Sequence, residues 1–503
     1  MGRKVAIFGC GAVGKCVLYY LTRFIRVSYK NVSIVDCLEA EAKFPAVQEC
    51  IASGATFLKY KITSANVEEL INDVLRLKAG DAIIDLTTRT PTMKIFAECR
   101  RRQLFYINTD IYDESVPLPI VNNTLDGAIR ATHAIIDDVY RKTEHHGKVT
   151  HVLECGMNPG LISIFVKRGL VDMAKWVQSK CKAKARRPQM EELKLALSSC
   201  DYHGIAKALG VRVIHCSEID TQVPTVKQIN KGCFMNTWSC VGLIDEGLEP
   251  AEIAVGTHEQ VIPFAPKRVE MAFPQIALLG KDGIKVQSRS YVPIATKTAE
   301  GAQAVEFKEI QGRCVHHGES ISLNIFLGRD DYAPTMHYVY AMNPTTEAQL
   351  QTMNRRQLLR ASLDPAKMHV MNAHQDKLHG TDNVGACFLL DANPITGEKK
   401  PWGWWCGSML DTDTVRNDLN DPYFGPTVIQ VMAGVLSGLS WAMKHPERGL
   451  MFTENIDGRY ILKKAKKYLG TIYSGPITCP IVGTTLKELM IGKRLKHTNI
   501  TSM

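Results

Sequence analysis

Several features that would assign the sequence to a class at once are missing from it. No Cys-x-x-Cys pair occurs among the fifteen cysteines, so neither a structural zinc site nor thioredoxin-like redox chemistry is expected. The N-terminus has no apolar region typical of a signal peptide, and no run of eighteen apolar residues occurs. We therefore expect a cytoplasmic protein with reduced thiols and no membrane-spanning segment.

A strong charge imbalance is missing as well. Lysine and arginine number 61 against 51 acidic residues, a net charge of +10 spread over 503 residues. The densest basic runs, residues 180–187 and 463–467, contain no aromatic residues that could stack on bases. They are typical of solvated helix ends or loops, so no nucleic-acid partner is expected. Length and composition are those of a globular protein of two or three domains.

What the sequence does contain is a nucleotide-binding pattern at its beginning. Residues 4–8, which are apolar after Lys4, predict a buried strand. Residues 15–24 predict a helix, and residues 32–35 a second strand that ends at Asp36. Between the first strand and the helix lies a G-x-G-x-x-G motif, made of Gly9, Cys10, Gly11, Ala12, Val13 and Gly14. A tight turn in another kind of βαβ unit is the alternative, but the full context favours dinucleotide binding.

Each part of this motif has a physical role in holding a dinucleotide. Gly9 allows the tight turn, Gly11 lets the backbone approach a pyrophosphate, and Gly14 permits close packing of helix on strand. Free N–H groups at the start of the helix attract the phosphates. Asp36 can accept hydrogen bonds from both ribose hydroxyls and repels a 2′-phosphate. The predicted cofactor is therefore NAD rather than NADP.

Strands and helices go on alternating up to residue 153, which predicts an α/β fold with a doubly wound parallel Rossmann sheet. The expected elements are a helix over 67–77, a strand over 82–86, a helix over 91–101, a strand over 104–107, a helix over 127–140 and a strand over 149–153 that closes the sheet. Ligands bind outside the carboxyl ends of such strands. Thr87, Thr88, Thr109 and Asn158 follow strand ends and are predicted to contact the cofactor.

The second half of the chain changes to a strand-rich pattern that predicts an α+β substrate-binding and dimerisation domain. Strands are expected over 211–215, 253–255, 269–271, 276–278, 285–287, 304–307, 322–326 and 337–340, and a long apolar helix over 426–443. The predicted domains are a dinucleotide-binding Rossmann domain over 1–158, the α+β domain over 159–425, and a helical segment over 426–503 that packs back on the first domain.

Polar motifs in this half leave alternatives open. His317 and Glu319 share one face if their segment is extended, and they could bind a metal or form an acid–base pair. No third ligand lies at usable spacing, so no metal is predicted. Trp238 stands in a polar run, where it could bind substrate or only pack half-buried. Asn158 could reach the nicotinamide carboxamide or the substrate, or serve only to turn the chain.

The order of these motifs resembles the bacterial-type homospermidine synthases, which belong to the saccharopine dehydrogenase-like group of Rossmann enzymes. The motifs are GCGAVG, GMNPGLIS, SEIDTQ, NTWS, GTHE, HHGESIS, WWCGS and a PERGL tail, spread from about residue 3 to about residue 475. The resemblance implies a homodimer that joins two putrescines, or putrescine and spermidine, into homospermidine. It also implies that ammonia or 1,3-diaminopropane is released and that NAD stays bound.

The resemblance also implies roles for particular residues. His317, Glu319, Glu218, Trp238 and Asn158 fall on the family's catalytic positions, and Glu246 on a substrate-binding one.

Two places depart from the family pattern. The segment Thr87-Thr88-Arg89 replaces an acidic residue, and Tyr112 replaces a carboxylate. Asp110, Asp113 and Glu114 lie close by in the sequence, and one of them, with Asp110 and Asp113 as the first candidates, is expected to contact the substrate amine instead.

Two rival functions remain to be separated. A saccharopine or carboxynorspermidine dehydrogenase of the same fold would need an arginine for a substrate carboxylate, and Arg89 is a candidate for that role. A Rossmann-type regulator that senses NAD would not need the acid–base residues that this sequence retains. Both alternatives are weaker than the synthase.

Overall fold

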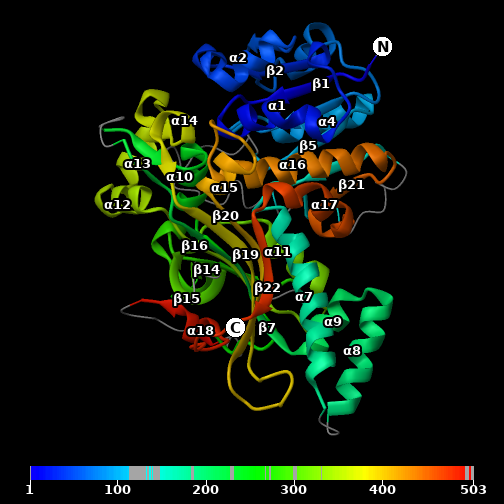
Figure 1. The fold of residues 1–503 in the computed structure, drawn as a ribbon, viewed down its shortest axis with the longest axis vertical. Coiled ribbons are helices and arrows are strands. Elements are labelled where there is room, and N and C mark those ends of the chain that lie inside the picture. The colour runs from blue at the N-terminus through cyan, green and yellow to red at the C-terminus, as the bar shows by residue number, and fades with distance from the viewer. Residues whose placement is uncertain are drawn as a thin grey trace.

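Two β-sheets organise the chain in the computed structural model, which describes residues 2–112, 132, 135–136, 139, 148–182, 186–226, 232–264, 266, 268–270, 273–297, 303–329, 331–492 and 498–499. Figure 1 shows the first sheet with its helices at the top and the larger second sheet below it. None of the fifteen cysteines forms a disulfide.

The first sheet has seven parallel strands in the order β21-β6-β5-β4-β1-β2-β3. The strands are β1 Val5–Phe8, β2 Val32–Asp36, β3 Thr56–Lys59, β4 Ala82–Asp85, β5 Phe105–Asn108, β6 His151–Leu153 and β21 Leu450–Phe452. The strand order reverses between β1 and β4, which is where a doubly wound sheet binds its ligand. The predicted fold class is confirmed, including the second domain with its mixed sheet.

The edges of this sheet differ from the prediction. β6 does not close it, because β21 from far along the chain pairs in parallel with β6. β3 was not predicted, since its residues are exposed or only half-buried and give little apolar pattern. The helix expected over 67–77 is a short turn, α3 (Val67–Glu69), followed by a π-helical turn over Leu70–Val74. Most of the helix expected over 127–140 lies outside the described residues.

Helices cover both faces of the first sheet. They include α1 (Ala12–Phe24), α2 (Pro45–Ala52), α4 (Thr92–Arg102) and α16 (Pro426–Lys444). α16 packs on α1 and β5 (Figure 1). Among the described helices it alone has the length and apolar composition of a membrane span, with a mean hydropathy of 1.3, but 89% of that stretch is buried inside the protein. Burial of this kind is typical of a core helix.

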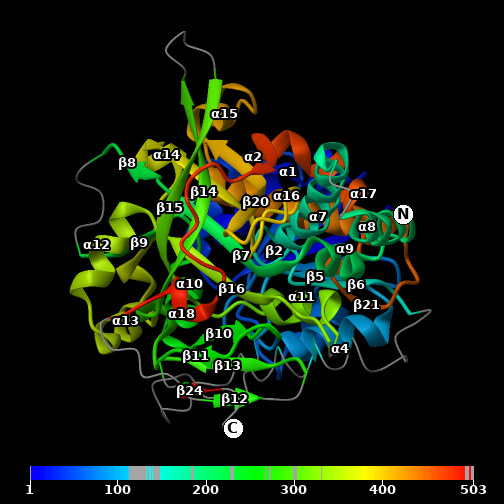
Figure 2. The ribbon, with the colours of Figure 1, turned by 90° about the horizontal axis from the view of Figure 1, so that it is seen from below.

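The second sheet has eleven strands, and several of the polar motifs lie on it. The central path is β12-β13-β10-β16-β7-β19-β20-β22, and β14, β15 and β23 join at its side. The bounds are β7 Val211–Asp220, β10 Ala251–Ala254, β12 Arg268–Glu270, β13 Ile276–Leu279, β14 Gln287–Lys297, β15 Gln303–Arg313, β16 Thr335–Ala341, β19 Thr381–Leu390, β20 Trp402–Asp411, β22 Thr471–Pro476 and β23 Met490–Ile491. In Figure 2, β14 and β15 form a long hairpin that extends away from the body.

Pairing in this sheet brings distant polar residues to one face. β16 runs parallel to β7 with Tyr340 beside Glu218, and β19 runs antiparallel to β7 with Asp382 beside Asp220. Because side chains alternate along a strand, Glu218 and Asp220 point to the same side, together with Tyr338 and Tyr340.

The remaining elements link the two sheets. They include α7 (Leu161–Lys180), α10 (Cys240–Leu248), α11 (Glu319–Leu327), α12 (Pro344–Thr352), α13 (Arg355–Ser362), α14 (Ala373–Asp376), α17 (Gly458–Ala465) and α18 (Leu486–Leu489). We call each sheet with its attached helices a unit. After residue 425, α16 and β21 join the first unit, built on the seven-stranded sheet, whereas β22 and β23 join the second unit, built on the eleven-stranded sheet. The division into 1–158, 159–425 and 426–503 stays a prediction.

The strand predicted over 322–326 is wrong, because these residues belong to the helix α11. Ile321, Ser322, Leu323 and Asn324 are all buried, so the helix has no polar face. The alternation of apolar and small polar residues then imitates the period of a strand. The strand expected over 285–287 is likewise misplaced, since residues 283–285 form a 3₁₀ turn and β14 begins at Gln287.

Close packing of α16 against the turn after β6 yields a test of the fold. A Cβ added at Gly434 would overlap the carbonyl oxygen of Gly156, and backbone cannot move aside as a side chain can. We expect Gly434→Ala to lower the free energy of unfolding by about 1–3 kcal/mol, as overpacking does. Ser437→Ala on the same helix is the control, since the Ser437 hydroxyl is buried without a hydrogen-bond partner and its loss should be harmless. Equal effects in denaturant unfolding would contradict this packing.

Candidate active site

A cavity of about 660 Å³ lies at the switch point of the first sheet. Gly9, Gly11, Ala12, Val13, Gly14, Asp36, Thr87 and Thr88, eight of the ten residues predicted to bind the cofactor, line it. Thr109 and Asn158 do not line it. The opposite wall comes from the second unit and includes residues 239–241 and 368–370. The cavity therefore lies between the Rossmann sheet and the start of α10.

The glycine motif has the geometry of a phosphate cradle. Gly9 has φ +90°, and a Cβ there would lie 2.7 Å from the carbonyl oxygen of Leu86. A Cβ at Gly14 would overlap the carbonyl of Gly9, whereas nothing lies within 4 Å of the Cβ position at Gly11. No side chain caps the start of α1, so its first N–H groups remain available to a phosphate.

Asp36 is held in place at the end of β2. Its Oδ2 accepts a hydrogen bond from the Cys10 N–H at 2.6 Å, and its Oδ1 accepts one from the Leu38 N–H at 2.8 Å. A carboxylate has further lone pairs, so Asp36 can still accept from ribose hydroxyls. The residues present therefore fit a dinucleotide, and the negative charge favours one without a 2′-phosphate.

One histidine–carboxylate pair at the cavity wall has no counterpart in the sequence analysis. His369 lines the cavity, and its Nε2 lies 2.9 Å from both carboxylate oxygens of the buried Asp376. Asp376 also accepts a hydrogen bond from the Asn372 N–H, which fixes the dyad. No motif signals this pair in the sequence.

Glu218 is at the centre of a buried polar cluster on the second sheet. Its Oε2 accepts hydrogen bonds from the Asn158 amide at 2.6 Å and from the Tyr338 hydroxyl at 2.5 Å. Asn158 also donates to the Tyr338 oxygen at 2.8 Å. The GMNPG turn thus brings Asn158 to Glu218, so the structure joins two residues that the sequence analysis assigned separately.

Two further carboxylates, both missed from the sequence, complete the cluster. Burial raises the pKa of Glu218 to about 7, and hydrogen bonds from Tyr338 and Asn158 limit the rise. Burial also raises the pKa of Asp220 to about 6. The pKa of Asp382 is well above its usual range, first because of burial and then because of the charges of Glu218 and Asp220. The cluster therefore holds at least one proton near neutral pH and would release it to solvent when a cation binds.

His317 and Glu319 lie together although their segment is not an extended strand. His317 Nδ1 is 3.2 Å from Glu319 Oε1, and Glu319 Oε2 accepts a hydrogen bond from the Gly160 N–H at 3.0 Å. The ring of His317 packs against that of Tyr338, with centroids 4.4 Å apart. Glu319 thus orients His317 beside the Glu218 cluster, as an acid–base pair requires.

Trp238 lies at the edge of the same cluster. Its indole N–H donates to the Tyr340 hydroxyl at 3.3 Å, and the Tyr340 ring stacks on that of Tyr338 at 5.5 Å and 8°. Trp238 is half-buried and directly precedes Ser239, which caps α10 and lines the dinucleotide cavity. The aromatic residues therefore connect the dinucleotide cavity with the carboxylate cluster.

A second acidic group surrounds His316. Asp110, Glu154 and Glu246 are in electrostatic contact with it, and partial loss of hydration among the surrounding protein groups raises the pKa of each of the three carboxyls. Burial alone would lower the pKa of His316, but the charges of Glu252, Glu249 and Glu154 outweigh it and raise the pKa to about 10. Glu154 and Glu246 each have a buried oxygen that finds no hydrogen-bond partner among the residues that the structure describes. Such oxygens are expected where a cationic ligand binds.

The positions that depart from the family pattern have distinct environments. Arg89 is paired with Asp245, at 2.5 Å between Nη2 and Oδ1. Asp110 is exposed to solvent and accepts a hydrogen bond from the Ile111 N–H, close to the acidic group. Asp113 lies outside the described residues.

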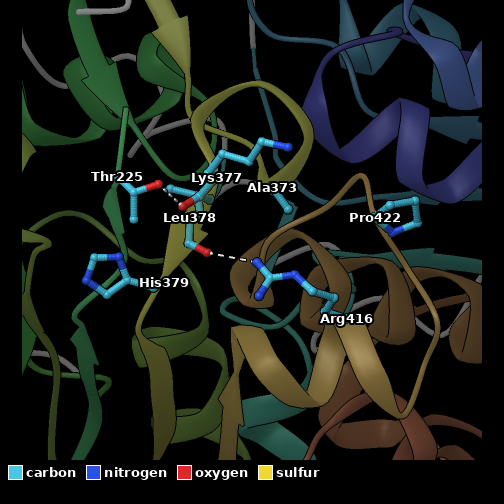
Figure 3. A pocket seen from close by; sticks show the side chains of 7 residues that line it. All are labelled: Thr225, Ala373, Lys377, Leu378, His379, Arg416 and Pro422. Atoms are coloured by element: carbon cyan, nitrogen blue, oxygen red, sulfur yellow. Dashed lines mark hydrogen bonds between the residues drawn. The ribbon is translucent and has the colours of Figure 1, made fainter. Parts of the chain in front are cut away.

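Other candidate sites in the described parts of the chain are weaker. No three His, Cys, Asp or Glu side chains there are arranged to hold a metal ion. A second cavity, of about 390 Å³, is lined in part by Lys377, His379 and Arg416. Figure 3 shows that the Lys377 ammonium and the His379 ring point in different directions, and that Arg416 donates to the Leu378 carbonyl. These basic side chains do not converge on one ligand.

The fold and the dinucleotide cavity define the class, a Rossmann-type nucleotide-dependent enzyme with a second, carboxylate-rich domain. Residues 5–139 match the saccharopine dehydrogenase NADP binding domain, and residues 156–471 match the saccharopine dehydrogenase C-terminal domain. The chain belongs to the saccharopine dehydrogenase family.

Similar proteins carry a more particular name. A homospermidine synthase of Mesorhizobium japonicum is 28% identical over 93% of this chain and 89% of its own length. One of Blastochloris viridis is 26% identical over 93% of this chain and 90% of its own length. The crystal structure of the Legionella pneumophila homospermidine synthase, in complex with NAD, has a TM-score of 0.74 and 24% identity and covers 98% of this chain and 99% of that one. The structural likeness shows a common fold.

The raised pKa of Asp382 predicts a pH-dependent gain in stability from its removal. The folded protein keeps a proton that the unfolded chain releases, so stability falls as the pH rises above the usual aspartate pKa of about 4. Asp382→Asn should therefore raise Tm by about 1–3 °C at pH 8, with a gain that shrinks toward pH 5.

Glu347→Gln is the control, because its change in Tm at pH 8 should have the opposite sign. Arg313 lowers the pKa of Glu347, so this substitution should lower Tm at pH 8, and the loss should fade as the pH falls through 4. A loss of stability in Asp382→Asn that is the same at pH 5 and pH 8 would contradict the buried-proton account.

Proposed function

We propose that this protein is an NAD-dependent homospermidine synthase, which joins two putrescines, or putrescine and spermidine, into homospermidine. The observation that carries the proposal is the set of buried carboxyls Glu218, Asp220 and Asp382, for which the structure provides no arginine or lysine partner among the described residues. Its support also includes the similarity to curated homospermidine synthases over 93% of the chain. A diammonium substrate supplies the missing positive charge.

Electrostatics make the carboxylates the main source of affinity. A carboxylate about 4 Å from an ammonium contributes about 4 kcal/mol at an effective dielectric of 20, before desolvation. A tryptophan face adds roughly 0.5–2 kcal/mol. Glu218 and Glu246 should therefore hold the ammonium groups, while Trp238 shapes the slot between them and Asn158 orients the amine beside Glu218.

The chemistry requires one amine to be neutral. A hydride leaves the carbon next to a nitrogen only after that nitrogen has lost its proton, which costs about 4 kcal/mol near pH 7.5 for an amine of pKa about 10.4. His317 accepts this proton, and Glu319 keeps its ring in position.

NAD, held by the glycine motif and Asp36, would supply the hydride acceptor that oxidises the first amine to an imine and the hydride for the later reduction. The second amine adds to the imine carbon, ammonia leaves, and the new imine that forms is reduced to the secondary amine. With spermidine as the first substrate, 1,3-diaminopropane leaves instead. His317 returns the proton that the leaving amine needs. No net oxidation occurs, so the protein acts as an aminobutyl transferase.

A saccharopine- or carboxynorspermidine-type dehydrogenase is the alternative, and the placement of Arg89 argues against it. Its guanidinium already binds the Asp245 carboxylate and Ser362, so it is not available to a substrate carboxylate. We further propose a cytoplasmic homodimer that acts on small polyamines and binds neither nucleic acid nor membrane.

The direct test is incubation of the protein with putrescine and catalytic NAD, followed by mass spectrometry of the products. We expect homospermidine and ammonia in equal amounts without accumulation of NADH. Stoichiometric NADH from a carboxylated amine would support the dehydrogenase instead, and no turnover with any amine would favour the regulator.

Substitution of Glu218 should separate substrate binding from cofactor binding. Glu218→Gln removes one negative charge at the amine, so kcat/KM for putrescine should fall about 100-fold, while the Kd for NAD should stay within about threefold. Glu347→Gln, in the same domain but paired with Arg313, should leave both constants unchanged. Equal losses of NAD and putrescine binding in Glu218→Gln would rule out this role.

The pH profile follows from the same groups. Glu218, whose pKa is about 7, must ionise to hold an ammonium, and the reacting amine must lose its proton. Activity should therefore rise as the pH increases through 7 and reach its maximum in the alkaline range. A maximum below pH 7 would contradict the proposed roles of both groups.

A further inference from the structure

Arg89 connects the two units of the chain at the wall of the dinucleotide cavity. It follows β4, lines the cavity, and reaches across to α10 of the second unit. Its Nε donates to Asp245 Oδ2 at 2.7 Å, and its Nη2 donates to Oδ1 at 2.5 Å. Two parallel hydrogen bonds of this kind fix the carboxylate in orientation as well as in distance.

The same guanidinium also binds the end of α13. Nη1 donates to the Ser362 carbonyl at 3.1 Å, and Nη2 donates to the Ser362 hydroxyl at 2.8 Å. The Arg89 and Asp245 side chains are only 16% and 28% exposed. Arg89 also has φ +56°, a conformation that side-chain-bearing residues rarely adopt, so its contacts must hold it there. Three segments are thus joined through one side chain.

The helix that Arg89 holds serves both binding regions. At its start, Ser239, Cys240 and Val241 line the dinucleotide cavity, directly after Trp238. Near its end, Glu246 follows Asp245 and belongs to the acidic group around His316. A shift of α10 would therefore move the cavity wall together with Glu246, the carboxylate proposed to bind the substrate.

We propose that Arg89 is a positioning residue that latches α10 to the Rossmann unit and so couples dinucleotide binding to the placement of Trp238 and Glu246. This inference rests on the proposed function for its kinetic consequence, though not for its structural one. Arg89 contacts neither the substrate nor its reacting atoms in this account and acts only through α10.

The pair between Arg313 and Glu347 provides a matched control. It has the same bidentate form, at 2.8 and 2.5 Å, and similar exposure, 13% and 31%. Both partners lie in the second unit, on β15 and α12, so the pair does not connect the two units.

The first experiment compares Arg89→Met, Arg89→Lys and Arg313→Met in kinetics and thermal unfolding. We expect Arg89→Met to raise the KM for putrescine at least tenfold with less than a threefold change in the Kd for NAD. Arg89→Lys can keep one hydrogen bond, so its KM for putrescine should lie between those of Arg89→Met and the unaltered protein. Arg313→Met should lower Tm about as much as Arg89→Met but change the KM less than threefold. Equal changes in KM for the two methionine variants would overturn the proposal.

The second experiment is independent of the substrate. Hydrogen exchange of residues 240–248 is measured with and without NAD, and NAD should slow it at least fivefold in the unaltered protein but less than twofold in Arg89→Met. Asp245→Asn should show the same reduced protection by NAD as Arg89→Met. The variant that carries both substitutions should lose no more of this protection than either single variant. NAD protection that persists in Arg89→Met would refute the latch even if the protein makes no homospermidine. Protection that is lost, in a protein without synthase activity, would refute only the proposed function.

Discussion

The structure depends on the burial of several carboxyl groups in one sheet, for which the described parts of the chain provide no lysine or arginine partner. Glu218 and Asp220 on β7 and Asp382 on β19 are brought together by strand pairing, and burial raises the pKa of each. Charged carboxylates at this depth are unfavourable, so the cluster lowers that cost by holding protons. In the proposed function, a cationic substrate supplies the positive charge that replaces those protons.

The rest of the architecture brings this cluster to the cofactor. The GMNPG turn carries Asn158 from the first sheet to Glu218, and α16 packs against the same turn at Gly434. α10 forms one wall of the dinucleotide cavity with its first residues and supplies Glu246 near its end. Because the site is assembled from both units, a change in their relative position would alter cofactor and substrate contacts together.

The sequence predicted the site where its residues lie close together in the chain. It did not predict contacts that arise when distant strands or segments pair. The glycine motif and Asp36 lie within thirty-six residues, and each has its predicted place. Asp382 and Tyr338 meet Glu218 only through the neighbours of β7, and His369 meets Asp376 without any motif. The helix over Glu319–Leu327 was mistaken for a strand because burial on all sides removes the amphipathic period. Long-range pairing explains the missed contacts and tertiary burial explains the mistaken helix, and no local pattern encodes either.

The most direct measurement is the number of protons released when putrescine binds. Calorimetry of the NAD-bound protein at pH 6, in buffers with different ionisation enthalpies, gives this number while both substrate amines remain ammonium ions. The account predicts that close to one proton is released by the unaltered protein, since the carboxyl cluster must ionise to receive the cation, and clearly less by Asp382→Asn. Binding without proton release would mean that the carboxylates are already charged, which would contradict the account.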